Sequence, residues 1–122
     1  MNIGKTGGMG EEAAREHLES NGYKILRTNY QTRYGEIDII CEKDGYLAFC
    51  EVKTRAGTAY GFPRDFVTAA KQKKIISTAQ MYLSETNAGL QPRFDVIEVF
   101  TDPTGSAVLA VSHLEDAFGE NY

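Results

Sequence analysis

The chain has 122 residues, 42% of them hydrophobic and 25% charged, which suits one globular domain over residues 1–122 and argues against extended disorder. No apolar run reaches the roughly 20 residues needed to span a bilayer, and no export signal is visible at the N-terminus, so we expect a cytoplasmic protein with no membrane partner. The net charge of −4 argues against a protein that coats DNA or RNA nonspecifically, because such binding uses many phosphate contacts from Lys and Arg.

The N-terminal segment predicts a flexible lead-in over residues 1–10, because it is rich in glycine and has no hydrophobic periodicity. A helix is predicted over Glu11–Ser20, ending at the Asn-Gly pair that follows. In that helix Glu11, Ala14 and Leu18 share one face, which is expected to lie against the protein body. An acid on this face is unusual, because burying an unpaired carboxylate is costly.

Three strand-like runs follow, at Tyr23–Gln31, Glu36–Lys43 and Tyr46–Thr54. Asp44 and Gly45 join the last two runs, and Asp-Gly between apolar segments is a strong signal for a hairpin with a two-residue turn. The glycines and the proline of residues 55–63 predict a loop after this hairpin.

A long helix is predicted next, capped by Thr68 or Asp65 and ending near Asn87. Its buried side is expected to carry four apolar residues: Ile75, Ile76, Ala79 and Leu83. Two further strands are expected at Arg93–Phe100 and Ala107–Val111, with a turn between them and a C-terminal tail over residues 114–122. The predicted element order is therefore α, β, β, β, α, β, β, which is an α/β fold.

The two cysteines, Cys41 and Cys50, lie inside apolar strand-like runs, where a thiol is expected to be buried and reduced. The chain has only two histidines and no pair of cysteines at zinc-binding spacing, so a zinc site would lack nearby ligands. His17 and His113 have no partner at a catalytic spacing, and we assign them no role.

The two-residue turn fixes the register of the hairpin, because counting outward from it places Asp38 opposite Glu51 and Glu36 opposite Lys53. Opposite residues point to the same face of the sheet. One face is then wholly apolar: Ile37, Ile39, Cys41, Ala48, Cys50 and Val52. The other face is apolar near the turn, at Ile40, Leu47 and Phe49, and carries the three acids and Lys53 at its far end.

Two acids that face each other across strands repel, and a sheet normally avoids this pairing unless something compensates. Mg²⁺ is one such compensation, because it binds carboxylates together with water and substrate phosphate. Held by Asp38 and Glu51, it can lower the pKa of a bound water and neutralise a phosphodiester oxygen. Lys53 can orient the attacking water or stabilise the charge on the phosphate. These residues therefore predict phosphodiester hydrolysis.

The alternative interpretation is a solvated surface hairpin whose acids and lysine form weak cross-strand ion pairs. Glu11 favours the metal site, because from the inward face of its helix it can reach the carboxylate pair as a further metal ligand, directly or through water. An acid near a helix start also has an ordinary explanation in the helix dipole, but the dipole does not account for the inward position of Glu11.

At these residues the chain resembles the PD-(D/E)XK nuclease superfamily, whose signature is an Asp on one strand and Asp/Glu-X-Lys on the next, here Asp38 and Glu51–Lys53. The signature often has Pro before the Asp, where this chain has Ile37. More closely, the chain resembles the YraN family of uncharacterised bacterial proteins, which is related to archaeal-type Holliday junction resolvases. The matching segments span most of the chain: Gly10–Glu11 with Ala14 and Leu18, Gly22–Tyr23 with Ile25–Leu26 and Asn29, Gly35–Asp38, Phe49–Arg55, and Arg93–Val96.

The resemblance implies a restriction-endonuclease-like core, in which helices flank a mixed sheet and Mg²⁺ or Mn²⁺ is held at Asp38 and Glu51. By position, Glu11 matches the acid that such resolvases carry on their first helix. The implied activity is that of a divalent-metal-dependent endonuclease acting on structured or branched DNA, without an organic cofactor. A homodimer is the corresponding expectation, because enzymes of this kind cut two strands symmetrically.

Basic residues outside this core are candidates for nucleic-acid contacts at phosphates, and each has an alternative interpretation as ordinary surface charge. They are Arg33, Arg55, Arg64, Lys71, Lys73 and Lys74. We expect three aromatic side chains to pack the loop rather than stack on bases: Tyr60, Phe62 and Phe66. The alternative function is a noncatalytic nucleic-acid-binding or protein-interaction module that keeps the nuclease fold.

Overall fold

The computed structural model describes residues 7–57, 67–86 and 89–119. Within these ranges, two helices and five strands follow the order that the sequence predicted. Helix α1 spans Gly7–Ser20 and helix α2 spans Ala69–Thr86. The strands are β1 Lys24–Thr32, β2 Gly35–Lys43, β3 Tyr46–Ala56, β4 Gln91–Thr101 and β5 Val108–Phe118.

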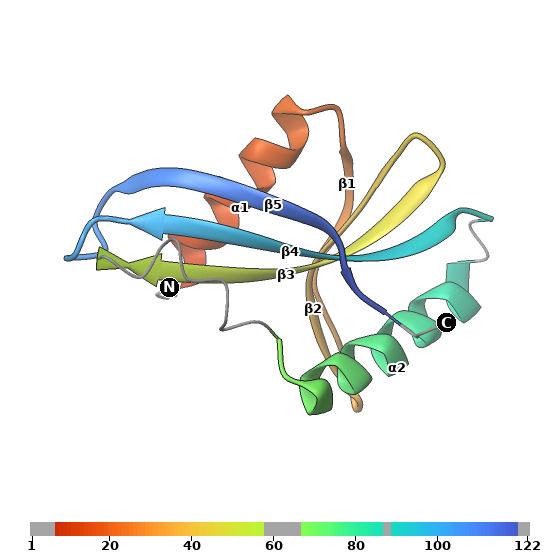
Figure 1. Cartoon of the computed structure of the whole chain (residues 1–122). Coiled ribbons are helices and arrows are strands. Elements are labelled where there is room, and N and C mark those ends of the chain that lie inside the picture. The colour runs from red at the N-terminus through yellow and green to blue at the C-terminus, as the bar shows by residue number, and fades with distance from the viewer. Residues whose placement is uncertain (1–6, 58–66, 87–88, 120–122) are drawn as a thin grey trace.

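The five strands form one sheet in chain order, and every neighbouring pair is antiparallel except β3 and β4. Helix α2 connects these two strands, as a parallel pair requires a crossover connection. Figure 1 shows α1 on one face of the sheet and α2 on the other. The predicted mixed sheet flanked by helices is therefore confirmed. Neither of these two helices is long and apolar enough to cross a membrane.

The turn between β2 and β3 has the predicted form. Asp44 and Gly45 have φ angles of 52° and 86°, both in the left-handed region that this two-residue turn requires. Asn, Asp and Gly tolerate that region better than other residues, which explains why the local sequence signal was reliable. The register also follows the prediction, beginning with Lys43 opposite Tyr46.

The pairing of β2 with β3 ends at Ile39 and Cys50. Beyond this point β2 continues along β1, while β3 continues along β4, so the sheet opens between β2 and β3. Asp38 and Glu51 are therefore not cross-strand partners, and neither are Glu36 and Lys53, contrary to the prediction. The prediction counted residues outward from the turn and took no account of strand twist, which accumulates along a hairpin.

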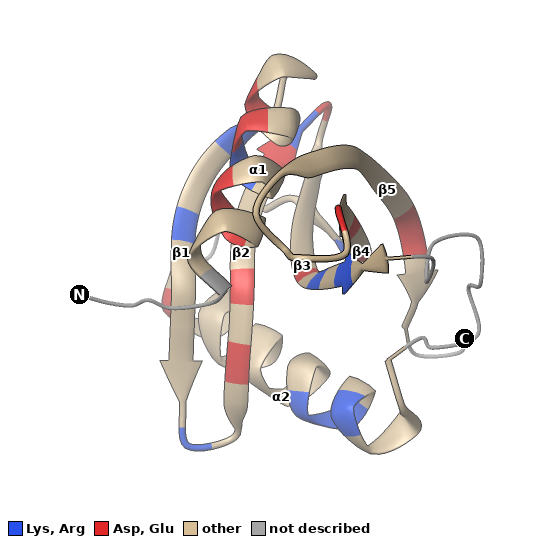
Figure 2. Ribbon diagram, turned by 90° about the vertical axis from the view of Figure 1, so that its left-hand side faces the viewer, with Lys and Arg blue, Asp and Glu red and all other residues tan. Residues whose placement is uncertain are grey.

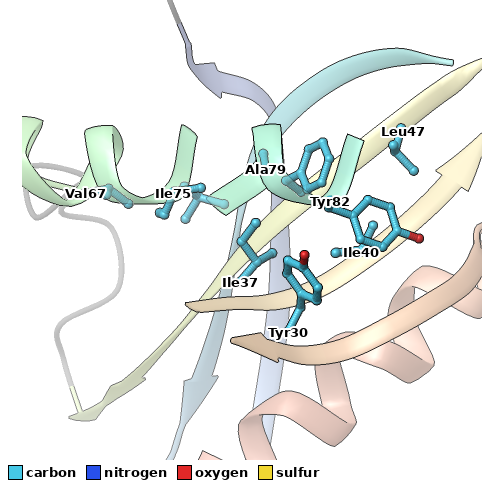
Figure 3. Close-up of a cluster of buried hydrophobic side chains, with 10 residues drawn as sticks. Tyr30, Ile37, Ile40, Leu47, Val67, Ile75, Ala79 and Tyr82 are labelled. Atoms are coloured by element: carbon cyan, nitrogen blue, oxygen red, sulfur yellow. The ribbon is translucent and has the colours of Figure 1, made fainter. Parts of the chain in front are cut away.

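The sheet divides the core into two clusters. On the α1 side, Ala14 and Leu18 pack on alternate strand residues: Ile39, Cys41, Ala48, Cys50, Ile97 and Val99. On the α2 side, three residues of the helix, Ile75, Ala79 and Tyr82, lie over the opposite face of the sheet, as Figure 3 shows in part. The strand residues in this cluster are Tyr30, Ile37, Ile40, Leu47, Phe49 and Val96. Each helix is thus held by an apolar stripe that fits one face of the sheet.

Ile37 lies on the α2 side, contrary to the alternation that predicted it beside Ile39 and Cys41. The facing strand β1 has a register shift near its start, and Asn29 has a φ of 51° where the strand lies against the middle of β2. Irregularities of this kind increase local strand twist. We attribute the position of Ile37 on the α2 side to this twist, which rotates β2 about its own axis at Asp38.

Helix α2 begins at the predicted cap. The hydroxyl oxygen of Thr68 accepts a hydrogen bond from the N–H of Lys71 at 3.2 Å. The predicted buried side is confirmed at Ile75 and Ala79. Asp65, the other candidate cap, lies outside the described residues.

Two segments that were predicted to be irregular are regular. Residues 7–10 belong to α1, where Gly10 lies so close to Thr54 of β3 that a side chain at this glycine would collide with it. Glycine here permits a close approach of helix to strand, and tertiary packing outweighs its poor helix propensity. At the other end, β5 continues to Phe118, whose ring stacks on Phe94 with centroids 5.4 Å apart. The predicted tail therefore begins later.

Candidate active site

Four acidic side chains approach one another where β2 separates from β3, and we call them the carboxylate cluster: Glu11, Glu36, Asp38 and Glu51. Glu11 reaches the cluster from α1, and Glu51 reaches it from β3. The structure thus brings together the three acids proposed from the sequence as metal ligands, and it adds Glu36. It does so at an opening in the sheet and not across a regular strand pair.

Asp38 is held in place by the backbone of the neighbouring strand. The N–H of Val52 donates a hydrogen bond to Oδ2 of Asp38 at 2.8 Å. In a continued ladder this N–H would bond to a carbonyl of β2, so the carboxylate takes the place of a missing backbone acceptor. The bond fixes the position of the carboxylate at the point where the two strands part.

The ionised form of Asp38 is poorly compensated. Burial and the negative charge of Glu51 raise the pKa of Asp38 from 3.8 to about 7, and the hydrogen bond from Val52 opposes this rise only in part. Glu11 and Glu36 push the pKa in the same direction as Glu51. A carboxyl group perturbed in this way inside a cleft is a candidate functional group.

Asn29 links two members of the cluster. With its amide nitrogen turned toward them, it donates hydrogen bonds to Oε2 of Glu36 and Oε1 of Glu11, each at 3.3 Å. Its left-handed backbone is one that Asn adopts more readily than most residues. Sequence reasoning missed this role, although Asn29 is an amide in the middle of a strand and lies in a segment that matches the family.

Lys71 of α2 supplies positive charge to the cluster. Its Nζ lies 2.8 Å from Oε2 of Glu51. The hydrogen bond to Glu51 raises the pKa of Lys71 against the opposing effect of burial. Lys71 was a sequence candidate for phosphate contacts, and its pairing with a predicted metal ligand was not foreseen.

A cavity of about 400 Å³ opens over three acids of the cluster, Glu36, Asp38 and Glu51, and Glu11 does not line it. Its walls are formed by β2, β3 and the first turns of α2: Gly35, Glu36, Asp38, Glu51, Thr68, Ala70, Lys71, Lys74 and Ile75. Figure 2 shows acidic residues along β2 and basic residues on α2. A cavity with carboxylates on one wall and ammonium groups on another suits a cation together with an anionic group such as phosphate.

Lys53 and Arg55 continue the strand beyond Glu51. Side chains alternate along a strand, so Lys53 and Arg55 are expected on the same face as Glu51, but Lys53 is not among the residues that line the cavity. The guanidinium of Arg55 is largely buried and pairs with Glu98 of β4, with Nε 3.1 Å from Oε2. This ion pair directs the side chain of Arg55 toward β4. Lys53 is then the basic residue of β3 that lies nearest to Glu51 along the strand.

The remaining basic candidates lie at different distances from the cluster. Lys74 lines the cavity, whereas Lys73 is exposed on α2 and does not line it. Arg33 is exposed after β1 and its guanidinium lies over the ring of Tyr34, 5.2 Å from the centroid. Four candidates lie outside the described residues: Tyr60, Phe62, Arg64 and Phe66.

A second polar cluster, which sequence reasoning also missed, surrounds Asp95 on β4. This fully buried carboxylate accepts two hydrogen bonds from Arg93, at 2.9 and 2.8 Å, and lies 2.7 Å from Nε2 of His113. The N–H of Asp116 donates a further bond at 3.0 Å. Burial raises the pKa of Asp95, but the bonds from His113, Arg93 and Asp116 outweigh it, so the pKa is lowered overall.

Cys50 completes a possible ligand set with Asp95 and His113, because their ligand atoms lie within 4.8 Å of one another. The hydrogen bond with Cys41 and burial raise the pKa of the Cys50 thiol well above its ordinary value, so this sulfur stays protonated. Arg93 already supplies the positive charge that Asp95 requires. We therefore interpret this cluster as structural. Both cysteines are buried and free, as predicted.

The carboxylate cluster lies in a part of the chain that is shared with known proteins. The model of a family described as "Uncharacterised protein family UPF0102" matches residues 10–99. A UPF0102 protein of Caldanaerobacter subterraneus subsp. tengcongensis is 40% identical, covering 97% of this chain and 98% of the relative. A UPF0102 protein of Symbiobacterium thermophilum is 46% identical, covering 83% of this chain and 86% of the relative. One of Syntrophotalea carbinolica is 48% identical, covering 76% of this chain and 76% of the relative. All four acids of the carboxylate cluster lie within the matched range.

Proposed function

The chain belongs to the uncharacterised protein family UPF0102, the YraN family that its sequence resembles, and from the geometry of its site we propose that it is a divalent-metal-dependent endonuclease. Asp38, Glu51 and Glu11 bind Mg²⁺ or Mn²⁺, and the substrate is structured or branched DNA. The observation that carries this proposal is the carboxylate cluster beside a cavity that also presents lysines, where burial and the charge of Glu51 raise the pKa of Asp38 to about 7.

The donor set fits such a cation. The cluster offers only carboxylate oxygens, which hard divalent cations prefer. The raised pKa of Asp38 means that the ionised cluster is short of positive charge, even with Lys71 paired to Glu51. When bound, the metal lowers the pKa of a water molecule and neutralises charge on the phosphodiester group.

The chain's own residues orient the groups that react. The N–H of Val52 holds Asp38, and the amide of Asn29 holds Glu11 together with Glu36. Lys53, on the same strand face as Glu51, orients the attacking water or stabilises the charge that develops on the phosphate. In this proposal the mixed sheet with its two helices is a restriction-endonuclease-like core.

The start of α2 supplies the contacts to the nucleic acid. Lys71 and Lys74 line the cavity, so a strand whose phosphate lies over the carboxylate cluster meets two ammonium groups. The lining has three acids and two lysines, so in this proposal the bound cation is what makes the cavity attract a phosphate on a chain whose net charge is −4. We further propose that a homodimer presents two such sites, one for each strand of a branched substrate.

Metal binding tests the first part of the proposal. Isothermal titration calorimetry with Mn²⁺ should show binding by the wild type at millimolar concentrations or below. An Asp38→Asn, Glu51→Gln double variant should show none, because both substitutions remove a charged ligand while keeping side-chain size. Wild type and double variant that behave alike would refute the metal site.

Cleavage tests the second part. The protein should cut at least one member of a panel of junction, flap, single-stranded and duplex DNA in Mn²⁺. Lys53→Met should retain Mn²⁺ binding and lose cleavage, because the lysine acts on water or phosphate and is not a ligand. Cleavage that persists unchanged in Lys53→Met would assign the activity to another site or to a contaminant.

A further inference from the structure

The ammonium group of Lys71 occupies the place where a cation is expected. Its Nζ lies 2.8 Å from Oε2 of Glu51, at bonding distance to an oxygen that we assign to the metal. The side chain of Glu51 is only 8% exposed, whereas that of Lys71 is 50% exposed. Glu51 is therefore confined to the site, while Lys71 reaches into it from solvent and can leave without disturbing the core.

The backbone that carries Lys71 is firmly placed. Its N–H is bonded to the capping hydroxyl of Thr68, and α2 is anchored one turn later by the buried side chain of Ile75. Only the four-carbon side chain has to move for the ammonium to change partner. Lysine suits this role because its charge is a flexible point charge with rotatable donors.

A divalent cation and an ammonium group compete for the same oxygen. Two positive charges at contact distance on one carboxylate repel each other, and the divalent ion is the stronger partner for a cluster of several acids. The displaced ammonium would remain at the wall of the cavity, because Lys71 and Lys74 both line it. There it faces Glu36, which also lines the cavity and is not assigned to the metal, and any phosphate that enters the cavity.

We propose that Lys71 is the internal counter-ion of Glu51 before metal binds, and that the metal displaces it so that its ammonium becomes a phosphate contact. This inference rests on the proposed function, since it takes the carboxylate cluster to be the metal site. Metal binding and substrate binding are then coupled, because the lysine that grips the substrate is released only when the cation has arrived.

Metal affinity provides a readout that is independent of cleavage. Lys71→Gln removes the competing charge and should bind Mn²⁺ about fivefold more tightly than the wild type, as expected when an ion pair of roughly 1 kcal/mol no longer has to be broken. Lys73→Gln is the matched control, because it removes the same charge from an exposed neighbour that does not line the cavity. Lys71→Arg keeps the charge and should stay near wild type.

DNA affinity tests the second half of the exchange. Fluorescence anisotropy with a DNA junction is measured with and without Mn²⁺ in the Lys53→Met background, where cleavage is expected to be lost. Mn²⁺ should increase junction affinity severalfold when Lys71 is present, and this increase should be much smaller when Lys71→Gln is added. An increase of equal size with and without Lys71→Gln would overturn the phosphate contact.

The outcomes separate this inference from the proposed function. Wild type that binds Mn²⁺ through Asp38 and Glu51, with equal affinity in Lys71→Gln and Lys73→Gln, would overturn the exchange and leave the nuclease proposal standing. Weaker Mn²⁺ binding by Lys71→Gln would also overturn it, by showing that the lysine positions Glu51 for the metal. Wild type that does not bind Mn²⁺ would overturn both.

Discussion

Replacing Asp38 with Asn tests the electrostatics of the carboxylate cluster without any assay of activity. Asn has nearly the same shape, and its Oδ1 can accept the hydrogen bond from Val52, but it carries no charge. The pKa of Asp38 is about 7 in the folded protein and 3.8 in a model peptide, so folding favours the protonated form. Ionisation of Asp38 therefore destabilises the fold, with no effect below about pH 4 and the full effect above about pH 7.

The size of the effect follows from the two pKa values. A rise from 3.8 to about 7 corresponds to a penalty of about 4 kcal/mol on the ionised form. We expect the variant to recover about half of this, about 2 kcal/mol at about pH 8, because Asp38 is partly open to solvent and neighbouring acids share the proton. For a chain of this length, such a gain raises Tm by roughly 8 °C.

Unfolding in urea and on heating, followed by circular dichroism in the presence of a chelator, measures this difference across pH. Wild type and Asp38→Asn should unfold alike near about pH 4 and diverge toward about pH 8, with the variant the more stable. Under the proposed function, millimolar Mn²⁺ should then reverse the order, because it would stabilise the wild type and the variant would lack a proposed ligand. A variant no more stable than the wild type at about pH 8 without metal would show that ionised Asp38 does not destabilise the fold.

Asp102 provides a control with the opposite sign. In the turn after β4, its carboxylate accepts hydrogen bonds from the N–H of Ser106 and the hydroxyl of Thr104, each at 2.9 Å, and these bonds lower the pKa of Asp102. Its ionised form therefore stabilises the fold above its ordinary pKa, and that contribution is lost as pH falls. Asp102→Asn should lower stability at about pH 8, where Asp38→Asn raises it.

Three further predictions concern the structural core. Asp95→Asn leaves the largely buried Arg93 without its carboxylate, so the free energy of unfolding in urea should fall by about 3 kcal/mol. A loss of stability within error of zero would contradict a stabilising role for the buried ion pair. The thiol of Cys50 is buried and its pKa is raised, so iodoacetamide should alkylate it only when urea unfolds the chain. Mass spectrometry measures the labelling, and rapid labelling of the native protein would contradict this prediction. Leu18→Ala, at a fully buried position against the sheet, should cost about 3 kcal/mol, and a mild effect would show that α1 packs loosely.

Features set by local chemistry were predictable from the sequence. Asp44 and Gly45 tolerate the left-handed backbone of a two-residue turn, so the turn and the pairing from Lys43 as far as Ile39 followed from two residues. The hydroxyl of Thr68 caps α2 for an equally local reason. These signals depend only on residues close in sequence, so the structure formed as they predicted.

Most features that depend on distant segments were not predictable, although helix periodicity did place Glu11 on the inward face from which it reaches the other acids. Glycine-rich residues 7–10 are helical because Gly10 fits closely against β3, and β5 runs past the expected end because Phe118 stacks on Phe94. The pairing of Lys71 with Glu51 joins two elements whose approach depends on the path of α2 across the sheet. Single-sequence periodicity contains no information about such contacts.

The place where regular alternation fails is also the place that makes the site. In a continued β2–β3 ladder, the N–H of Val52 would bond to a carbonyl, and Asp38 and Glu51 would form an isolated pair on one face. The opening of the sheet instead leaves that N–H to Asp38, and it lets Glu11 approach from the α1 side and Lys71 from the α2 side. Helices on opposite faces can contribute to one cluster only where the sheet between them is interrupted. The departure from local rules is therefore the physical condition for bringing four acids and a lysine together, and such departures are expected at functional or strained sites.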